Sequence, residues 1–163
     1  MRQIYVKADA VLDARPEVVY AAIADYRHGH PNIVPQESFF DLQVEQGGYG
    51  AGTIHSFKFK AMGVVKTFRQ RVSEPEPGRV LVEQDIDTPQ NTTTTFTMIP
   101  VENGQKARVE ISTTMNPTPG LTGIVERLVM PMINARVYRK ELKLLEAFAR
   151  RNAPGFAPAS HTS

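Results

Sequence analysis

The stretch "ERLVMPMINARVYRKEL", residues 126–142, has the spacing of a helix but carries a proline near its centre. Pro131 removes one backbone hydrogen bond and its ring clashes with the carbonyl of Arg127, at a cost of about 3 kcal/mol in a helix interior. A helix that spans a hollow beneath a curved sheet bends at such a residue, and the flanking Met130 and Met132 fill irregular space. A proline that only bends a packed helix, or that separates two helices, is the alternative.

Composition places the chain among single-domain globular proteins. Its 163 residues are 41% hydrophobic and 22% charged, and at this length roughly 70% of the unfolded surface can be buried. We expect one domain over residues 1–152. The proline-rich segment 153–163 is expected to be a flexible C-terminal tail.

The sequence also excludes several classes of protein. It has no cysteine, so disulfides, thiolate metal sites and cysteine nucleophiles are excluded. The first ten residues lack a signal-peptide core, and no run approaches the roughly 18 apolar residues of a membrane span, so we expect a cytoplasmic protein without a transmembrane segment. The net charge of +2 comes with no recognition motif, so we expect no nucleic-acid partner.

Hydrophobic periodicity predicts the order of the elements. Alternation over residues 3–13 indicates a half-buried strand, and Pro16 then suits the first position of a helix that ends near Tyr26. A short, broken helical connector follows over residues 27–35. Period-two patterns with turn residues between them predict six further strands, at 37–46, 51–61, 63–74, 79–87, 92–101 and 106–116. From Pro119 to about Arg151 the pattern is helical.

This order predicts an α+β fold. Short links between successive strands favour a seven-stranded antiparallel sheet, and two short helices follow the first strand. The long C-terminal helix is then the main cover for the apolar face of the sheet. A sheet that curls around one helix leaves a space between the two layers.

At this point the sequence resembles a known superfamily. The matching segments are the opening strand with "ARPEVVYAAIADY", the glycine-rich "EQGGYGAGTIHSF", the turn and strand "VSEPEPGRVLVEQDI", and the C-terminal helix. Together they resemble the START-like helix-grip superfamily, which includes Bet v 1-like proteins, polyketide cyclases/dehydrases and lipid transport proteins. The resemblance covers about residues 1–150. It implies a hydrophobic cavity between sheet and helix that holds lipids, isoprenoids, polyketides or similar molecules.

Alternation predicts which side chains line that cavity. On the strands we assign Ala61, Val64, Lys66, Val72, Val80, Val82, Ile86, Val109 and Ile111 to the inner face, and on the helix Leu121 and Val125. The predicted ligand-binding residues are Tyr26, His55, Phe57, Phe59, Phe68, Gln70, Gln84, Thr94, Phe96, Met98, Thr113, Met115, Ile124, Leu128 and Met132. Tyr26, Phe57, Phe59, Phe96 and Met115 are expected to face the helix. Leu128 is expected to project into the hollow, whereas Leu142, Leu145 and Phe148 close on the core. From the pattern alone a filled core is the plainer interpretation, and the resemblance favours the cavity.

Few residues indicate catalysis or cofactor binding. "GGYGAG" lacks the ending of a P-loop, so we interpret loop 47–52 as a mobile hairpin, with a gate at the cavity mouth as a second possibility. His28 and His30 lie near Asp25, but zinc sites need three or four ligands. We expect no metal, no cofactor and no catalytic residue. In an enzyme, His55, Gln70, Gln84 and Tyr26 would polarise or deprotonate a ligand.

The sequence therefore predicts a non-catalytic protein, monomeric or weakly dimeric, that binds a hydrophobic small molecule. Two alternatives stay open. One is a polyketide cyclase or dehydratase that uses the same cavity. The other is a protein-interaction module with a closed core.

Overall fold

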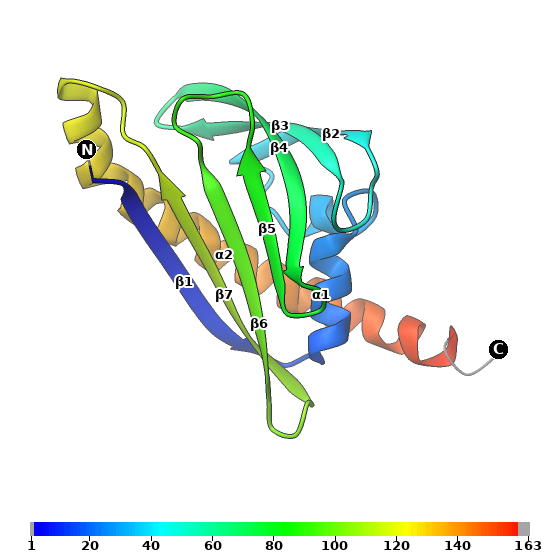
Figure 1. Ribbon diagram of the computed structural model, residues 1–163. Helices are drawn as coiled ribbons and strands as arrows, with labels where there is room; N and C mark the ends of the chain where they lie inside the picture. The colour runs from blue at the N-terminus through cyan, green and yellow to red at the C-terminus, as the bar shows by residue number, and fades with distance from the viewer. Residues whose placement is uncertain (1, 160–163) are drawn as a thin grey trace.

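The computed structural model describes residues 2–159, in which seven strands form one antiparallel sheet beside a long helix (Figure 1). The strands lie in the order β1-β7-β6-β5-β4-β3-β2. Their bounds are β1 (Ile4–Leu12), β2 (Phe39–Gln46), β3 (Ile54–Ala61), β4 (Val64–Glu76), β5 (Val80–Asp85), β6 (Thr93–Val101) and β7 (Lys106–Met115). The helices are α1 (Pro16–Ala24), a 3-10 turn η1 (His30–Asn32) and α2 (Leu121–Ala159). The predicted α+β class, seven strands and element order are confirmed.

The residues in the turns make successive strands pair with each other. Between β3 and β4, Ala61 pairs with Val64, so Met62 and Gly63 form a two-residue loop. Both have positive φ, 53° and 76°, as a type I′ turn requires, and its twist matches that of the flanking strands. β1 and β7 pair from Ile4 with Met115 to Leu12 with Ala107, which places the first strand at one edge of the sheet.

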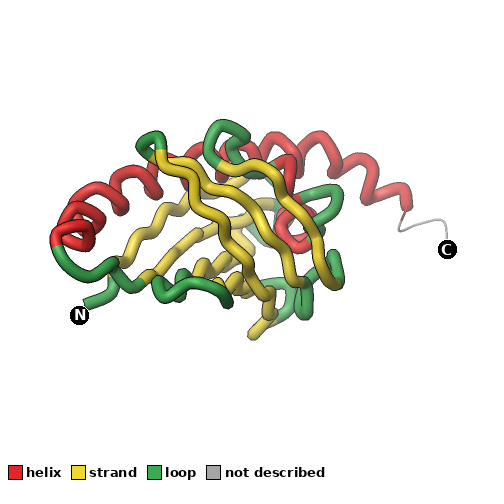
Figure 2. Tube along the Cα trace, turned by 90° about the horizontal axis from the view of Figure 1, so that it is seen from above, coloured by secondary structure: helices red, strands yellow, loops and turns green. Residues whose placement is uncertain are grey.

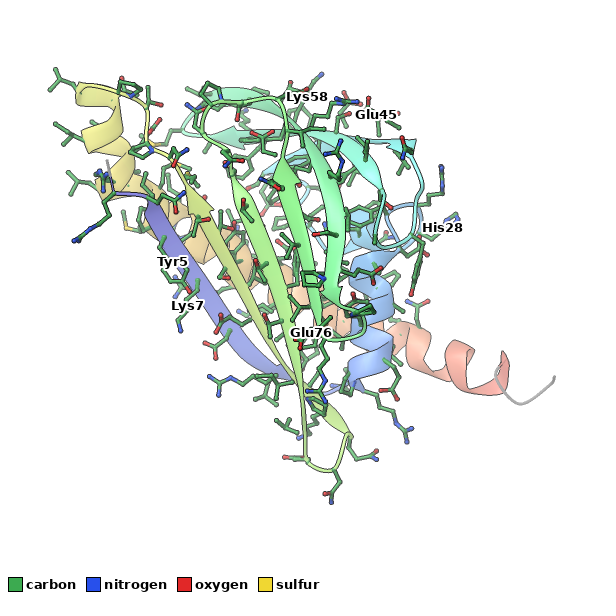
Figure 3. The ribbon with its side chains drawn as sticks, in the orientation of Figure 1. Tyr5, Lys7, His28, Glu45, Lys58 and Glu76 are labelled. Carbon is green, nitrogen blue, oxygen red and sulfur yellow. The ribbon has the colours of Figure 1, made fainter. Side chains whose placement is uncertain are left out.

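Alternation gives each strand an inner and an outer face. On β1, Ile4, Val6 and Leu12 are buried, whereas Tyr5 and Lys7 lie on the outer face (Figure 3). The outer face also carries ion pairs such as Lys58 with Asp41. Only the inner face of the sheet therefore contributes to the hydrophobic core.

The two α-helices cover different parts of the sheet. Pro16 opens α1, which buries Val19 and Ile23 completely and packs against α2. α2 runs behind the sheet and contacts β1 (Figures 1 and 2). Its second half buries Leu142 and Leu145 in the core, as predicted. The strands at the far edge, β2 to β4, make few or no close backbone contacts with α2.

α2 is a single helix that continues through Pro131. It extends beyond the expected end near Arg151, and the last four residues of the expected tail, 160–163, lie outside the described residues. None of the described helices contains a stretch that is long and apolar enough to cross a membrane.

Candidate ligand-binding site

A cavity of about 730 Å³ lies between the first part of α2 and the inner face of the sheet. Side chains from β2, β3, β4, β5, β6 and β7 line it, together with side chains of the η1 connector and of α2 between Thr122 and Glu141. This volume lies in the range of pockets that enclose small organic ligands. The space predicted between sheet and helix is therefore present.

One wall of the cavity is aromatic. The ring centroids of Phe39 and Phe59 are 5.0 Å apart, those of Phe39 and Phe57 are 5.6 Å apart, and those of Phe57 and Phe68 are 5.5 Å apart. These spacings are typical of favourable aromatic pairs, which hold one another in place. The wall gives a bound molecule a broad, rigid apolar surface.

The cavity opens at the turn between β3 and β4. The lining residues there, Met62, Val64, Lys66 and Thr67, are all exposed. Across the opening lies the first part of α2, where Val125 is 51% exposed. The mouth is thus mostly apolar, with the Lys66 ammonium group nearby.

The opposite, buried end of the cavity is polar. Glu83 on β5 accepts a hydrogen bond of 2.6 Å from the Tyr26 hydroxyl. The Nε2 atoms of His30 and His55 lie 3.5 Å and 3.9 Å from the same Glu83 oxygen. All four side chains are buried. Burial, followed by the charge and hydrogen bond of Glu83, raises the pKa of Tyr26, so its phenol remains a proton donor.

His30 contacts a backbone carbonyl on one side of its ring and Glu83 on the other. Its Nδ1 lies 2.9 Å from the carbonyl oxygen of Ile23, which can only accept, so Nδ1 carries a hydrogen. Nε2 lies 3.5 Å from the Glu83 oxygen that accepts the hydrogen bond of Tyr26.

Among the described residues, His55 and Gln70 are the side chains with fully buried polar atoms that lack a hydrogen-bond partner. They lie directly opposite each other on β3 and β4 and are 1% and 3% exposed. Neither ring nitrogen of His55 has a hydrogen-bond partner, and neither does Oε1 of Gln70. Burial lowers the pKa of His55 to about 4, so the imidazole is neutral at pH 7 and offers one donor and one acceptor.

Glu141 brings a second carboxyl group to the buried end, from α2. Burial, and to a lesser degree the charge of Glu83, raises its pKa well above the usual value. A protonated carboxyl group can donate a hydrogen bond, whereas an ionised one cannot.

Other polar groups at this end are satisfied by one another. The Thr94 and Thr113 hydroxyls are 2.8 Å apart, and Thr113 lies 2.5 Å from the Tyr138 hydroxyl. Nearer the start of α2, Glu126 accepts two hydrogen bonds from Thr118. Among the described residues, His55 and Gln70 differ from these groups because they carry fully buried polar atoms that have no hydrogen-bond partner.

The structure brings most predicted strand residues together. His55, Phe57, Phe59, Phe68, Gln70, Thr94, Phe96, Thr113 and Met115 all line the cavity. Tyr26 and Met98 do not line it, although both are fully buried. Tyr26 lies behind Glu83 and supports it, and Met98 belongs to the solid core.

The predicted inner face of β5 is wrong. Gln84 is exposed and donates to Asn91, while its neighbours Leu81, Glu83 and Asp85 are buried. The alternation on β5 is compatible with either face, and the more apolar set, Val80, Val82 and Ile86, favours the wrong one. The sheet instead buries acidic side chains that have hydrogen-bond partners, such as Glu83. Glu83 lies directly opposite Thr94 on β6, whose inward orientation was predicted correctly.

The predicted inner face of the first half of α2 is wrong except at Val125, which lines the cavity. Leu121, Ile124, Leu128 and Met132 point to solvent, with Leu128 74% exposed and Met132 62% exposed. The cavity is instead lined by the row Thr122, Glu126, Met130, Asn134 and Tyr138 and by the adjacent row Val125, Val129, Val137 and Glu141. Ile124, Leu128 and Met132 follow the same four-residue spacing on nearly the opposite side of the helix. The more apolar row is therefore the exposed one.

The glycine-rich loop 47–52 does not line the cavity, so the gate at the mouth is not supported. The loop packs against the end of α1. There the backbone N–H of Tyr26 donates to the Gly48 carbonyl, and the backbone N–H of Gly50 donates to the Ala24 carbonyl. Its four glycines all have positive φ. Glycine adopts this conformation without steric cost, which explains why the loop contains four of them.

The described histidines, His28, His30 and His55, do not form a metal centre with other side chains. His28 is exposed on the connector (Figure 3), whereas His30 is buried. Within residues 2–159, no group of three or more histidine or acidic side chains is placed to hold a metal ion.

The comparisons with known proteins agree with this geometry. Residues 3–150 match the sequence model of the family described as polyketide cyclase / dehydrase and lipid transport. The solution structure of the KanY protein is 25% identical, covers 92% of this chain and 99% of its own, and has a TM-score of 0.78. Among curated proteins, none matches the chain.

Two more distant structures show the same fold. The crystal structure of Zhui aromatase/cyclase from Streptomyces sp. R1128 is 16% identical over 93% of this chain and 96% of its own, with a TM-score of 0.78. That of Ara h 8.0201 is 11% identical over 93% and 100%, with a TM-score of 0.63. The helix-grip fold expected from the sequence is confirmed.

Proposed function

Because the chain belongs to the polyketide cyclase / dehydrase and lipid transport family, we propose that it binds one hydrophobic small molecule of lipid, isoprenoid or polyketide type. The observation that carries this proposal is the cavity of about 730 Å³ with its wall of four phenylalanines. Transfer of an apolar molecule from water to such a wall contributes about 25 cal/mol for each Å² of apolar surface buried. The cavity argues against the alternative of a closed core.

Native mass spectrometry of protein taken from its source cells tests the proposal. We expect a non-covalent adduct of small mass, present at one copy per chain and lost on denaturation. The same protein stripped of its adduct is expected to take up a neutral apolar fluorophore such as N-phenyl-1-naphthylamine. A protein that carries no adduct and also fails to take up the fluorophore would contradict the proposal.

A cyclase or dehydratase is the second candidate, and one observation favours it. The neutral imidazole of His55 and the protonated carboxyl of Glu141 both line the cavity, which gives one proton acceptor and one proton donor around a bound molecule. Turnover of a linear poly-β-ketone thioester, followed by mass spectrometry for loss of water, distinguishes an enzyme from a carrier. A carrier returns the thioester unchanged.

A further inference from the structure

The buried end of the cavity has hydrogen-bonding groups that the protein itself does not use. His55 and Gln70 are almost fully buried, and three of their polar atoms have no partner in the structure. A buried donor or acceptor without a partner is destabilising, and most such groups in proteins are paired. Their position on the lining of a cavity indicates a bound group that pairs with them.

From this arrangement we propose that the cavity selects a neutral ligand with a hydroxyl group at the end that reaches His55 and Gln70. The inference rests on the proposed function and defines the ligand class further. Residues directly opposite on antiparallel strands have Cβ atoms about 5 Å apart, so one hydroxyl group can contact both side chains. It accepts from the N–H of the neutral imidazole and donates to Oε1 of Gln70.

Other end groups fit this site less well. A methyl group leaves the three polar atoms unpaired. A carbonyl oxygen accepts from His55 but leaves Oε1 of Gln70 without a donor. The hydroxyl group is the smallest function that both donates and accepts, so it pairs with both side chains at once.

A carboxylate is disfavoured by the surrounding charges. The Glu83 carboxyl lies 3.9 Å from Nε2 of His55, and Glu141 lines the same end. Among the described lining residues, Lys66 is the one lysine or arginine, and it lies at the exposed mouth. His30 already faces Glu83. An anionic end group would therefore be buried beside Glu83 without a free cation among the described lining residues.

The aromatic wall fits a flat ligand, and this allows a matched series of probes. 9-Anthracenemethanol, 9-methylanthracene and 9-anthracenecarboxylate share one fluorescent ring system and differ only in the end group. Fluorescence titration at pH 7 of adduct-free protein measures their dissociation constants. We expect the alcohol to bind about tenfold more tightly than the methyl compound, which corresponds to about 1.4 kcal/mol. The carboxylate is expected to bind most weakly.

Substitutions test whether His55 and Gln70 produce this preference. Gln70→Met and His55→Phe are expected to bind 9-methylanthracene as well as the wild type does and to lose the tenfold preference for the alcohol. Gln90→Met is the matched control, because Gln90 also lines the cavity but its amide already donates to Thr118. This control is expected to keep the preference. Circular dichroism confirms that each variant is folded, and Gln70→Met alone suffices if His55→Phe does not fold.

The possible failures are distinguishable. Equal binding of the alcohol and the methyl compound would overturn the hydroxyl site and leave the proposed apolar carrier intact. If the carboxylate binds most tightly, and if Lys66→Met removes this binding, the hydroxyl site is overturned in favour of an anion-binding site at the mouth. If none of the three probes binds, both the hydroxyl site and the proposed function fail.

Discussion

Glu83 on β5 and Glu141 on α2 line the same buried end of the cavity, one from the sheet and the other from the helix. Tyr26 donates a hydrogen bond to Glu83, whereas Glu141 faces the cavity. Burial and the charge of Glu83 raise the pKa of Glu141. The fold thus gives two carboxyl groups different surroundings within one cavity.

Glu141→Gln is expected to stabilise the protein at neutral and alkaline pH. The unfolded chain ionises this residue near pH 4.5, while the folded protein keeps it protonated to higher pH. The free energy of unfolding of the wild type therefore falls as pH rises above 4.5, by at most about 1.4 kcal/mol per pH unit, until the folded pKa is reached. Urea denaturation from pH 4 to pH 8 measures the gap between the two proteins.

Glu37→Gln is the contrasting variant for this measurement. Glu37 is exposed, and its own backbone hydrogen bond together with Lys140 lowers its pKa. Removing its charge is therefore expected to give no stabilisation at pH 8. A gap between wild type and Glu141→Gln that does not change with pH would show that Glu141 ionises normally.

His55 is expected to make the protein less stable in acid. Its pKa is lowered from 6.5 to about 4 in the folded state, mainly by burial. The unfolded chain therefore binds the proton first, and the free energy of unfolding falls between pH 6.5 and pH 4, by about 3 kcal/mol at most. His55→Phe is expected to lack this fall in urea denaturation curves. His28→Phe, on the exposed connector, controls for the loss of an imidazole. If the free energies of unfolding of the wild type and of His55→Phe change with pH in parallel, the prediction is refuted.

Val129→Trp is expected to block ligand uptake without unfolding the protein. Val129 lines the cavity, so the indole occupies space that is not filled by other side chains. In a packed core such a change costs about 1–3 kcal/mol, but here we expect a melting temperature close to that of the wild type. Uptake of N-phenyl-1-naphthylamine is expected to fall at least about tenfold, as measured by fluorescence titration.

Leu128→Trp is the neighbouring control for the cavity. Leu128 is directed to solvent, so this variant is expected to bind the fluorophore as the wild type does. The opposite result, with uptake lost in Leu128→Trp and kept in Val129→Trp, would show that the other face of α2 lines the cavity.

Gly50→Ala is expected to destabilise the protein more than Gly63→Ala does. Both glycines have positive φ, 62° and 76°, which costs an alanine about 1–2 kcal/mol. A Cβ at Gly50 would also lie 2.5 Å from Oε2 of Glu74, whereas at Gly63 no atom lies within 4 Å. The Glu74 carboxyl is held by Tyr20 and Ala51, so moving it weakens two hydrogen bonds. Equal losses in urea denaturation would indicate that loop 47–52 adjusts freely.

The fold was predictable from the sequence because its signals are local. Period-two alternation located every strand to within a few residues, and turn residues such as Gly63 marked the links between strands. Pro16 marked the start of α1. These features depend on neighbours in the chain, so a single sequence contains them.

The candidate site was predictable only in part, because it depends on which polar groups find partners. His55 and Gln70 were assigned through their place in an alternating apolar pattern. Glu83 and Glu141 were missed, since acidic residues are rarely buried unless paired, and their surroundings come from distant parts of the chain. The prediction of the helix face failed because the row from Thr122 to Tyr138 that lines the cavity is less apolar than the exposed row on the opposite side of α2.

Pro131 gives α2 two segments that are held with unequal strength. It supplies no N–H to the carbonyl of Arg127, and the residues before it border the cavity while Leu128 lies in solvent. The residues after it anchor the helix in the core through Leu142 and Leu145. Local opening is cheapest where few apolar contacts are lost. We therefore expect the first segment to separate from the sheet more readily than the anchored segment, so that release of a bound molecule requires local opening of one helical segment and no unfolding of the domain.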